Sequence, residues 1–109
     1  MLTRKSKEFG RPIYLVSDEP YRFLTYDDVK VEPVLPLYEY TVVVGSFSKS
    51  LGLAGERVGY LAIAPQMPDK QTLMNACTLT NRILGFVNPP VIGQHLMAAG
   101  LGSEVDTSI

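Results

Sequence analysis

The sequence has one cysteine, one histidine and no tryptophan, and it lacks long apolar runs. A single thiol, Cys77, excludes an intramolecular disulfide framework and a zinc site built from cysteines. The single histidine, His95, has no partner at metal-ligand spacing, so we expect no metal site. The longest apolar runs, such as residues 60–64, are far shorter than the roughly 20 residues that a membrane-spanning helix needs.

An excess of one sign of charge is also missing, because 10 Lys and Arg stand against 11 Asp and Glu, for a net charge of −1. Such a chain has no electrostatic reason to bind nucleic acid or an anionic membrane, and we expect neither as a partner. The basic residues near the start precede only a short apolar stretch at 13–16, which is shorter than the core of a secretion signal. We therefore expect a cytoplasmic protein.

Apolar residues are plentiful, since 46% of the chain is hydrophobic and 19% is charged. This composition offsets the entropy lost on ordering, and the length allows one domain. The mean hydropathy of +0.10 is high for a small domain with every face in water. It is typical of an interior part of a larger protein.

Three apolar segments predict a sheet. Residues 13–16 and 40–45 are β-prone without polar alternation, which indicates strands buried on both faces, as in a parallel sheet. Residues 57–64 form the third predicted strand, and residues 46–56, rich in glycine and serine, predict a loop. The remaining predicted elements are a short strand at 23–26 and helices at 2–9, 68–84 and 91–101. We expect an α/β fold.

Polar residues follow two of the buried segments, at 18–21 and at 46–49. Ligands of open α/β sheets bind outside the carboxyl ends of the strands, so both loops could face one site. Each candidate has two readings from the residues alone. Lys49 could be a surface lysine or a nucleophilic amine. Asp18 could be a turn residue or a carboxylate that stabilises a positive charge, and Tyr21 a packing aromatic or a phenol donor.

The sequences D-E-P-Y at 18–21 and S-F-S-K-S-L-G-L-A-G-E-R-V-G-Y at 46–60 resemble the class I/II pyridoxal-phosphate aminotransferases, which are aspartate aminotransferase-like proteins of fold type I. The resemblance extends over about residues 10–100. It implies pyridoxal 5′-phosphate as the cofactor, with Lys49 as the catalytic lysine that forms a Schiff base with it. Asp18 then pairs with the pyridine nitrogen, and Tyr21 hydrogen-bonds the ring oxygen.

The same resemblance assigns the phosphate ligands and a substrate residue. Ser46, Ser48 and Arg57 match the positions that bind the cofactor phosphate. Arg82 lies in a segment that in some members binds the second carboxylate of the substrate, although it could equally be a helix-terminal arginine that meets carbonyls and water. Three glycines are expected to allow close backbone approach and the turn into the last strand, namely Gly52, Gly55 and Gly59.

The fold that the resemblance implies is a partial mixed sheet with flanking helices. The strands near 13–17 and 40–45 are then parallel, and the strand at 57–64 is antiparallel to them. Residues 1–109 would form a single partial domain, a slice of the large cofactor-binding domain. The implied function is amino-group transfer between an amino acid and a 2-oxo acid in biosynthesis by a homodimer, with this fragment alone inactive. The alternative is a non-catalytic binding or interaction module that retains the fold slice.

Overall fold

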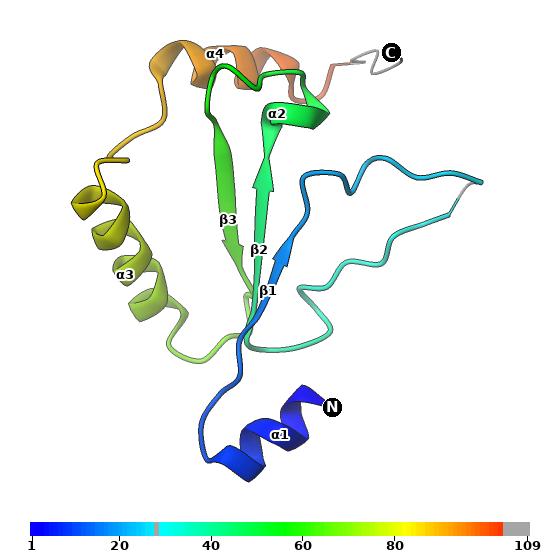
Figure 1. The fold of residues 1–109 in the computed structure, drawn as a ribbon, viewed down its shortest axis with the longest axis vertical. Helices are drawn as coiled ribbons and strands as arrows, with labels where there is room; N and C mark the ends of the chain where they lie inside the picture. The colour runs from blue at the N-terminus through cyan, green and yellow to red at the C-terminus, as the bar shows by residue number, and fades with distance from the viewer. Residues whose placement is uncertain (28, 104–109) are drawn as a thin grey trace.

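The computed structural model describes residues 1–27 and 29–103. Its centre is one sheet with strand order β1-β2-β3, formed by β1 (Leu15–Asp18), β2 (Thr41–Ser46) and β3 (Gly59–Ile63) (Figure 1). β1 runs parallel to β2, with Leu15 opposite Thr41. β3 runs antiparallel to β2, with Ser46 opposite Gly59. The predicted mixed sheet is therefore confirmed, and β2 is its central strand.

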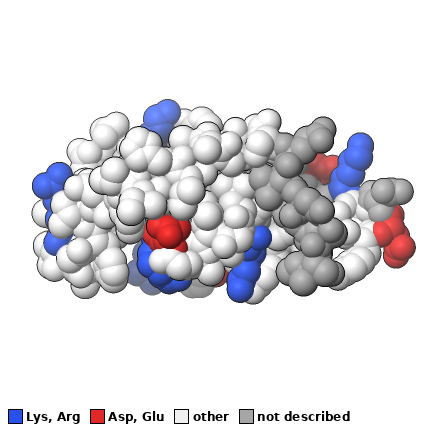
Figure 2. All heavy atoms as spheres, turned by 90° about the horizontal axis from the view of Figure 1, so that it is seen from above, with Lys and Arg blue, Asp and Glu red and all other residues white. Residues whose placement is uncertain are grey.

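Four helices flank the sheet within the described residues. They are α1 (Leu2–Phe9), α2 (Phe47–Ser50), α3 (Lys70–Ile83) and α4 (Val91–Gly100). α2 and α4 lie at the end of the sheet where β1 and β2 finish, and α1 lies at the opposite end (Figure 1). Seen from the end that carries α2 and α4, charged side chains of both signs are dispersed among uncharged ones (Figure 2). The helices predicted at 2–9, 68–84 and 91–101 are present within about two residues at each end.

The core is small and centred on β2. Val42, Ala64 and Met67 are buried, and Leu73 of α3 packs against them. Thr41, Val42 and Val43 of β2 are buried, which matches the continuous β-prone sequence of this strand, because side chains on a covered sheet face are shielded from water. Many other apolar side chains stay exposed, including Ile83, Phe86 and Ile92.

Hydroxyl groups tie α1 to the start of β1. The Tyr38 hydroxyl donates to the carbonyl of Ile13 at 2.8 Å, and the Ile13 amide donates to Ser6 Oγ at 3.1 Å. Ser6 Oγ lies 2.9 Å from the Tyr38 hydroxyl, and it must be the donor there because the tyrosine proton is already used. This network fixes the segment that enters β1.

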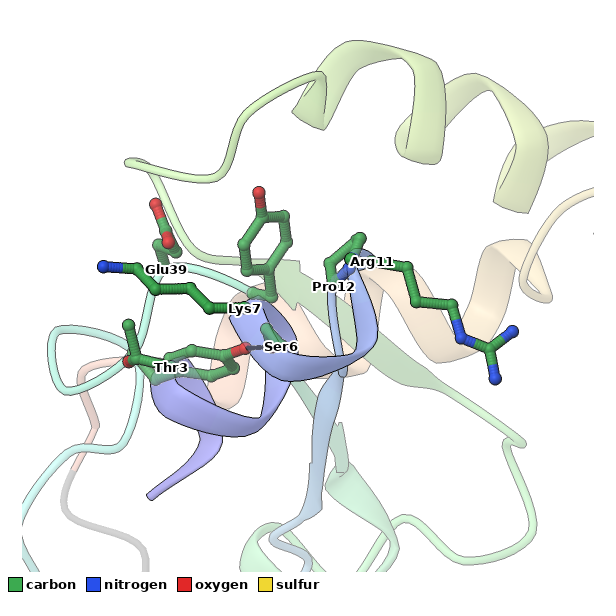
Figure 3. A pocket seen from close by; sticks show the side chains of 9 residues that line it. Thr3, Ser6, Lys7, Arg11, Pro12 and Glu39 are labelled. Carbon is green, nitrogen blue, oxygen red and sulfur yellow. Dashed lines mark hydrogen bonds between the residues drawn. The ribbon is translucent and has the colours of Figure 1, made fainter.

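A cavity of about 280 Å³ lies beside this network, at the end of the sheet away from Asp18. Lys7, Arg11 and Glu39 are among the side chains around it (Figure 3). Desolvation raises the pKa of the Tyr40 phenol at its wall, and the negative charge of Glu39 adds to the effect. Both causes favour the neutral form of the phenol.

Two predictions about local structure were wrong. Residues 23–26 form no strand, because the chain turns there, with the amide of Leu24 bonded to the carbonyl of Tyr21 at 2.9 Å. Figure 1 shows this part of the chain leaving the sheet, so it has no strand to pair with. The predicted loop at 46–56 contains the short helix α2. In addition, β1 and β3 each begin two residues later than expected.

Candidate functional site

The parallel strands β1 and β2 bring Asp18 and Lys49 to the same end of the sheet. Asp18 is the last residue of β1 and pairs with Val44, and the amide of Glu19 extends the ladder by donating to the carbonyl of Val44 at 2.8 Å. Lys49 lies in α2, three residues after β2 ends. The expectation that both residues lie at one edge of the sheet is confirmed. The expectation that both preceding strands are buried on both faces holds for β2 but is wrong for β1, whose residues alternate between half-buried and exposed, with Val16 62% exposed.

Tyr21 and Lys49 are close together in space. The Nζ atom of Lys49 lies 5.9 Å from the centroid of the Tyr21 ring, within the range of a cation–π contact. Both side chains are exposed. The turn after β1 and the helix after β2 therefore meet through an amine and an aromatic ring.

Two serine hydroxyls lie at the start of α2. Ser46 is the N-cap residue, and its Oγ accepts a hydrogen bond from the amide of Ser48 at 3.1 Å. The same Oγ lies 2.7 Å from the Oγ of Ser48, to which it donates. Capping of this kind satisfies a free amide of the first turn and fixes where the chain bends. Ser46 thus orients the turn that carries Lys49, and both hydroxyls lie on that turn.

The segment after α2 folds back on the start of the helix. The amides of Leu51 and Leu53 both donate to the carbonyl of Phe47, and the amide of Phe47 donates to the carbonyl of Val58 at 3.1 Å. Arg57 closes this segment with φ at 55°, a left-handed conformation that is costly for a residue with a side chain. Its guanidinium donates to the carbonyl of Ala54 at 3.0 Å.

The glycines of this segment differ in what they allow. Gly52 has φ at 67°, and a Cβ on Gly59 would lie 2.7 Å from the carbonyl oxygen of Gly45, so both need to be glycine as expected. Gly55 has no left-handed backbone, and a Cβ added there would meet no atom within 4 Å. The expectation that Gly55 allows a close approach was wrong.

Glu19 and Arg22 belong to the same turn, although the sequence alone assigned them no role. Arg22 Nη1 donates to Glu19 Oε2 at 2.8 Å, and the hydroxyl of Ser17 donates to the other oxygen at 2.9 Å. The sequence does carry a signal for this ion pair, because Glu19 and Arg22 have opposite charges and are three residues apart. Side chains at that spacing meet where the chain turns. Tyr21 lies between the two residues in the chain.

Arg82 lies on a different element from the other candidates, in the last turn of α3. α3 lies on the side of the sheet that carries β3, away from β1 (Figure 1). Within residues 1–27 and 29–103, no side-chain hydrogen bond or ion pair joins Arg82 to another candidate. Its role toward a substrate stays a prediction.

The described residues contain neither a cluster of metal ligands nor a membrane-spanning helix. Across residues 1–27 and 29–103, His, Cys, Asp and Glu side chains do not gather in threes that could hold a metal ion. Within the same residues, the helices are too short or too polar to cross a membrane.

Comparison with known proteins identifies the family. Residues 7–108 match the profile of the family described as aminotransferase class I and II. The chain therefore belongs to the class I and II aminotransferases. The match extends over almost the whole chain and includes every candidate residue.

Individual relatives agree with this assignment. An amino transferase of known crystal structure from Eubacterium rectale is 42% identical, with a TM-score of 0.90, and the match covers 97% of this chain and 27% of that one. The aspartate aminotransferase of Pyrococcus horikoshii is 34% identical over 76 residues, 69% of this chain and 19% of that protein. Histidinol-phosphate aminotransferase 1 of Cupriavidus pinatubonensis is 33% identical over 92 residues, 83% of this chain and 22% of that protein. This chain thus spans about a fifth to a quarter of the length of its relatives.

The residues of the site fit the cofactor that the family implies, pyridoxal 5′-phosphate. The Ser46 hydroxyl donates its proton to Ser48 Oγ at 2.7 Å, and among the described residues no hydrogen bond uses the proton of Ser48. The Ser48 hydroxyl is therefore the one that can donate to a phosphate in this arrangement. The guanidinium of Arg57 makes one hydrogen bond, so further N–H donors remain for an anion within the described part of the chain. An amine and a carboxylate complete the set at the same end of the sheet. The aldehyde, the ring nitrogen and the phosphate of the cofactor therefore each have a residue of suitable chemistry among these side chains.

Proposed function

We propose that this chain carries the lysine-bearing part of the cofactor site of a pyridoxal-phosphate-dependent aminotransferase. In this proposal residues 1–109 correspond to part of the large cofactor-binding domain. The complete enzyme exchanges an amino group between an amino acid and a 2-oxo acid, as part of biosynthesis in the cytoplasm. The observation that carries the proposal is the position of Lys49, 5.9 Å from the ring of Tyr21, at the edge where Asp18 ends β1.

When bound, the cofactor supplies an aldehyde that reacts with amines and a ring that takes up negative charge. Lys49 provides the amine for that aldehyde and later moves a proton at the α-carbon of the substrate. Asp18 holds a proton on the ring nitrogen, because a nearby carboxylate favours a positive charge. Ser46, Ser48 and Arg57 bind the phosphate, and Tyr21 donates to the ring oxygen. Arg82 is proposed to bind the second carboxylate of the substrate.

Transfer chemistry is favoured over a non-catalytic interaction module. The family match and the structural relative both describe aminotransferases. A module that had kept only the fold would have no need for an amine, a carboxylate and a phosphate-binding arginine at one edge. The chain alone is still expected to turn over no substrate, because it spans about a quarter of the structural relative.

The role of Asp18 gives a direct test. We expect Asp18→Asn to weaken binding of pyridoxal phosphate by about tenfold or more, because loss of a charge-assisted hydrogen bond removes about 1.5–3 kcal/mol. Binding is measured by titrating the chain with cofactor and following its visible absorbance. Asp27→Asn is the matched control, because Asp27 is also an exposed aspartate and asparagine tolerates its left-handed backbone. Equal affinities for the two variants, or no saturable change in the wild-type chain, would contradict the proposal.

Self-association is the second part of the proposal, with a homodimer as its simplest form. Around the link between α3 and α4, Ile83, Phe86 and Ile92 are 75%, 72% and 70% exposed. Contiguous exposed apolar side chains mark surfaces that another chain or segment covers. We expect the sedimentation coefficient to rise with concentration, and Phe86→Ser with Ile92→Ser to suppress that rise. Gln94→Ser on the same helix is the control, and a monomer at every concentration would refute self-association.

A further inference from the structure

The carboxylate of Glu19 is held from two sides. Ser17 Oγ donates to one oxygen at 2.9 Å, and Arg22 Nη1 donates to the other at 2.8 Å. The Glu19 side chain is 13% exposed and the Arg22 side chain 31% exposed. An ion pair withdrawn this far from water is stronger than a surface pair, and removing one partner leaves the other charge poorly solvated.

The same two residues are also fixed to the backbone around them. The amide of Glu19 donates to the carbonyl of Val44 in β2 at 2.8 Å. The second nitrogen of Arg22, Nη2, donates to the carbonyl of Val31 on the returning part of the long segment between β1 and β2. Hydrogen bonds of Glu19 and Arg22 therefore link the turn after β1 to the central strand β2 and to the chain at Val31.

Tyr21 lies inside this closed turn. Glu19 before it and Arg22 after it are both anchored, while the ring of Tyr21 is 56% exposed and lies near Nζ of Lys49. An exposed ring has few packing contacts of its own to hold it. Its position therefore depends on the backbone that the Glu19–Arg22 pair holds.

We propose that Glu19 and Arg22 are positioning residues that hold Tyr21 against Lys49. Neither needs to touch the cofactor, since their effect passes through the turn. The part of this inference that concerns the reactivity of Lys49 rests on the proposed function. The part that concerns the order of the turn does not.

The first experiment needs no cofactor. Arg22→Met keeps a long side chain but loses the hydrogen bonds to Glu19 and to the carbonyl of Val31. The amide of Leu24, which is bonded to the carbonyl of Tyr21, should then exchange its hydrogen about tenfold faster than in the wild type. The amide of Val43 in the centre of the sheet should exchange as in the wild type. Arg4→Met is the matched control, because Arg4 also pairs with a glutamate, Glu8, but at 3.6 Å and with its side chain 75% exposed. Unchanged exchange at Leu24 in Arg22→Met would overturn the inference.

The second experiment tests whether the pair acts through Tyr21. The amount of pyridoxal phosphate fixed on Lys49 by borohydride is measured by peptide mass spectrometry, relative to that on Lys70 of the same molecule. We expect about a fivefold lower ratio in Arg22→Met, a partial recovery in Arg22→Lys, and no further loss when Arg22→Met is added to Tyr21→Ala. A purely structural role would give additive losses, which would overturn the inference. The two experiments can also give different answers. If the wild-type chain carries no label on Lys49, the proposed function is refuted. If Leu24 still exchanges faster in Arg22→Met than in the wild type, the positioning role is supported.

Discussion

Lys49→Ala is expected to abolish the fixation of pyridoxal phosphate at this position when the loaded chain is reduced with borohydride. The cofactor aldehyde condenses with an amine. In the proposed function Lys49 provides that amine, because it lies near the ring of Tyr21 and closely follows Ser46 and Ser48 in the chain. Lys49→Arg should lose the label as well, because it keeps the positive charge but has no nucleophilic amine. The label is located by digestion and mass spectrometry.

Lys70→Ala is the matched control for that experiment. Lys70 is an exposed lysine of α3 whose Nζ donates to the carbonyl of Pro65 at 2.7 Å, far along the chain from the serine turn. Its replacement should leave the labelled fraction unchanged. A label that survives in Lys49→Ala, or one that maps mainly to Lys70 in the wild type, would refute Lys49 as the cofactor lysine.

Gly59→Ala is expected to destabilise the chain by about 1–3 kcal/mol, the usual cost of forcing an extra carbon into a packed position. The new Cβ would lie 2.7 Å from the carbonyl oxygen of Gly45, and that oxygen belongs to the paired backbone of β2. No flexible side chain can yield there, so β3 must separate from β2 beside Ser46. The same variant should therefore also lose cofactor label at Lys49.

Gly55→Ala in the same segment is the comparison. Nothing lies within 4 Å of its Cβ position and its φ is not positive, so the variant should match the wild type or gain up to about 1 kcal/mol from a less flexible unfolded chain. Urea unfolding of both variants gives the free energies. Equal stabilities for Gly59→Ala and Gly55→Ala would show that the close approach of β2 and β3 does not matter.

The sheet could be predicted because its signals are local and strong. Residues 40–45 are β-prone and contain three consecutive valines at 42–44, and this segment forms β2, the central strand of the sheet. The position of Asp18 and Lys49 at one edge followed from the rule that parallel strands end together. The antiparallel direction of β3 came from the family resemblance and not from any residue pattern.

Other features could not be predicted because they depend on contacts that a sequence pattern does not carry. Phe23 and Leu24 have strand-forming side chains, but hydrogen bonds of the turn and the absence of a neighbouring strand prevail there. Arg57 gave no sign of a left-handed backbone, because that conformation is imposed by the segment that folds back on Phe47. The distance between Tyr21 and Lys49 likewise depends on how two separate loops meet.

The central strand also determines where the gene can gain or lose codons. Asp18 is paired with Val44, and the backbone from there to Lys49 runs through the rest of β2 and directly into α2. A one-residue insertion or deletion in this stretch would turn every later side chain to the opposite face and rotate the lysine away from its partners. The segment between β1 and β2 leaves the sheet, but contacts hold it at the turn at 19–22, at Val31, at Leu35 against the core and at Tyr38 against Ile13. Between these points it can change in length at little cost. Length variation among descendants of this sequence should therefore concentrate between β1 and β2 and be absent from Thr41 to Lys49.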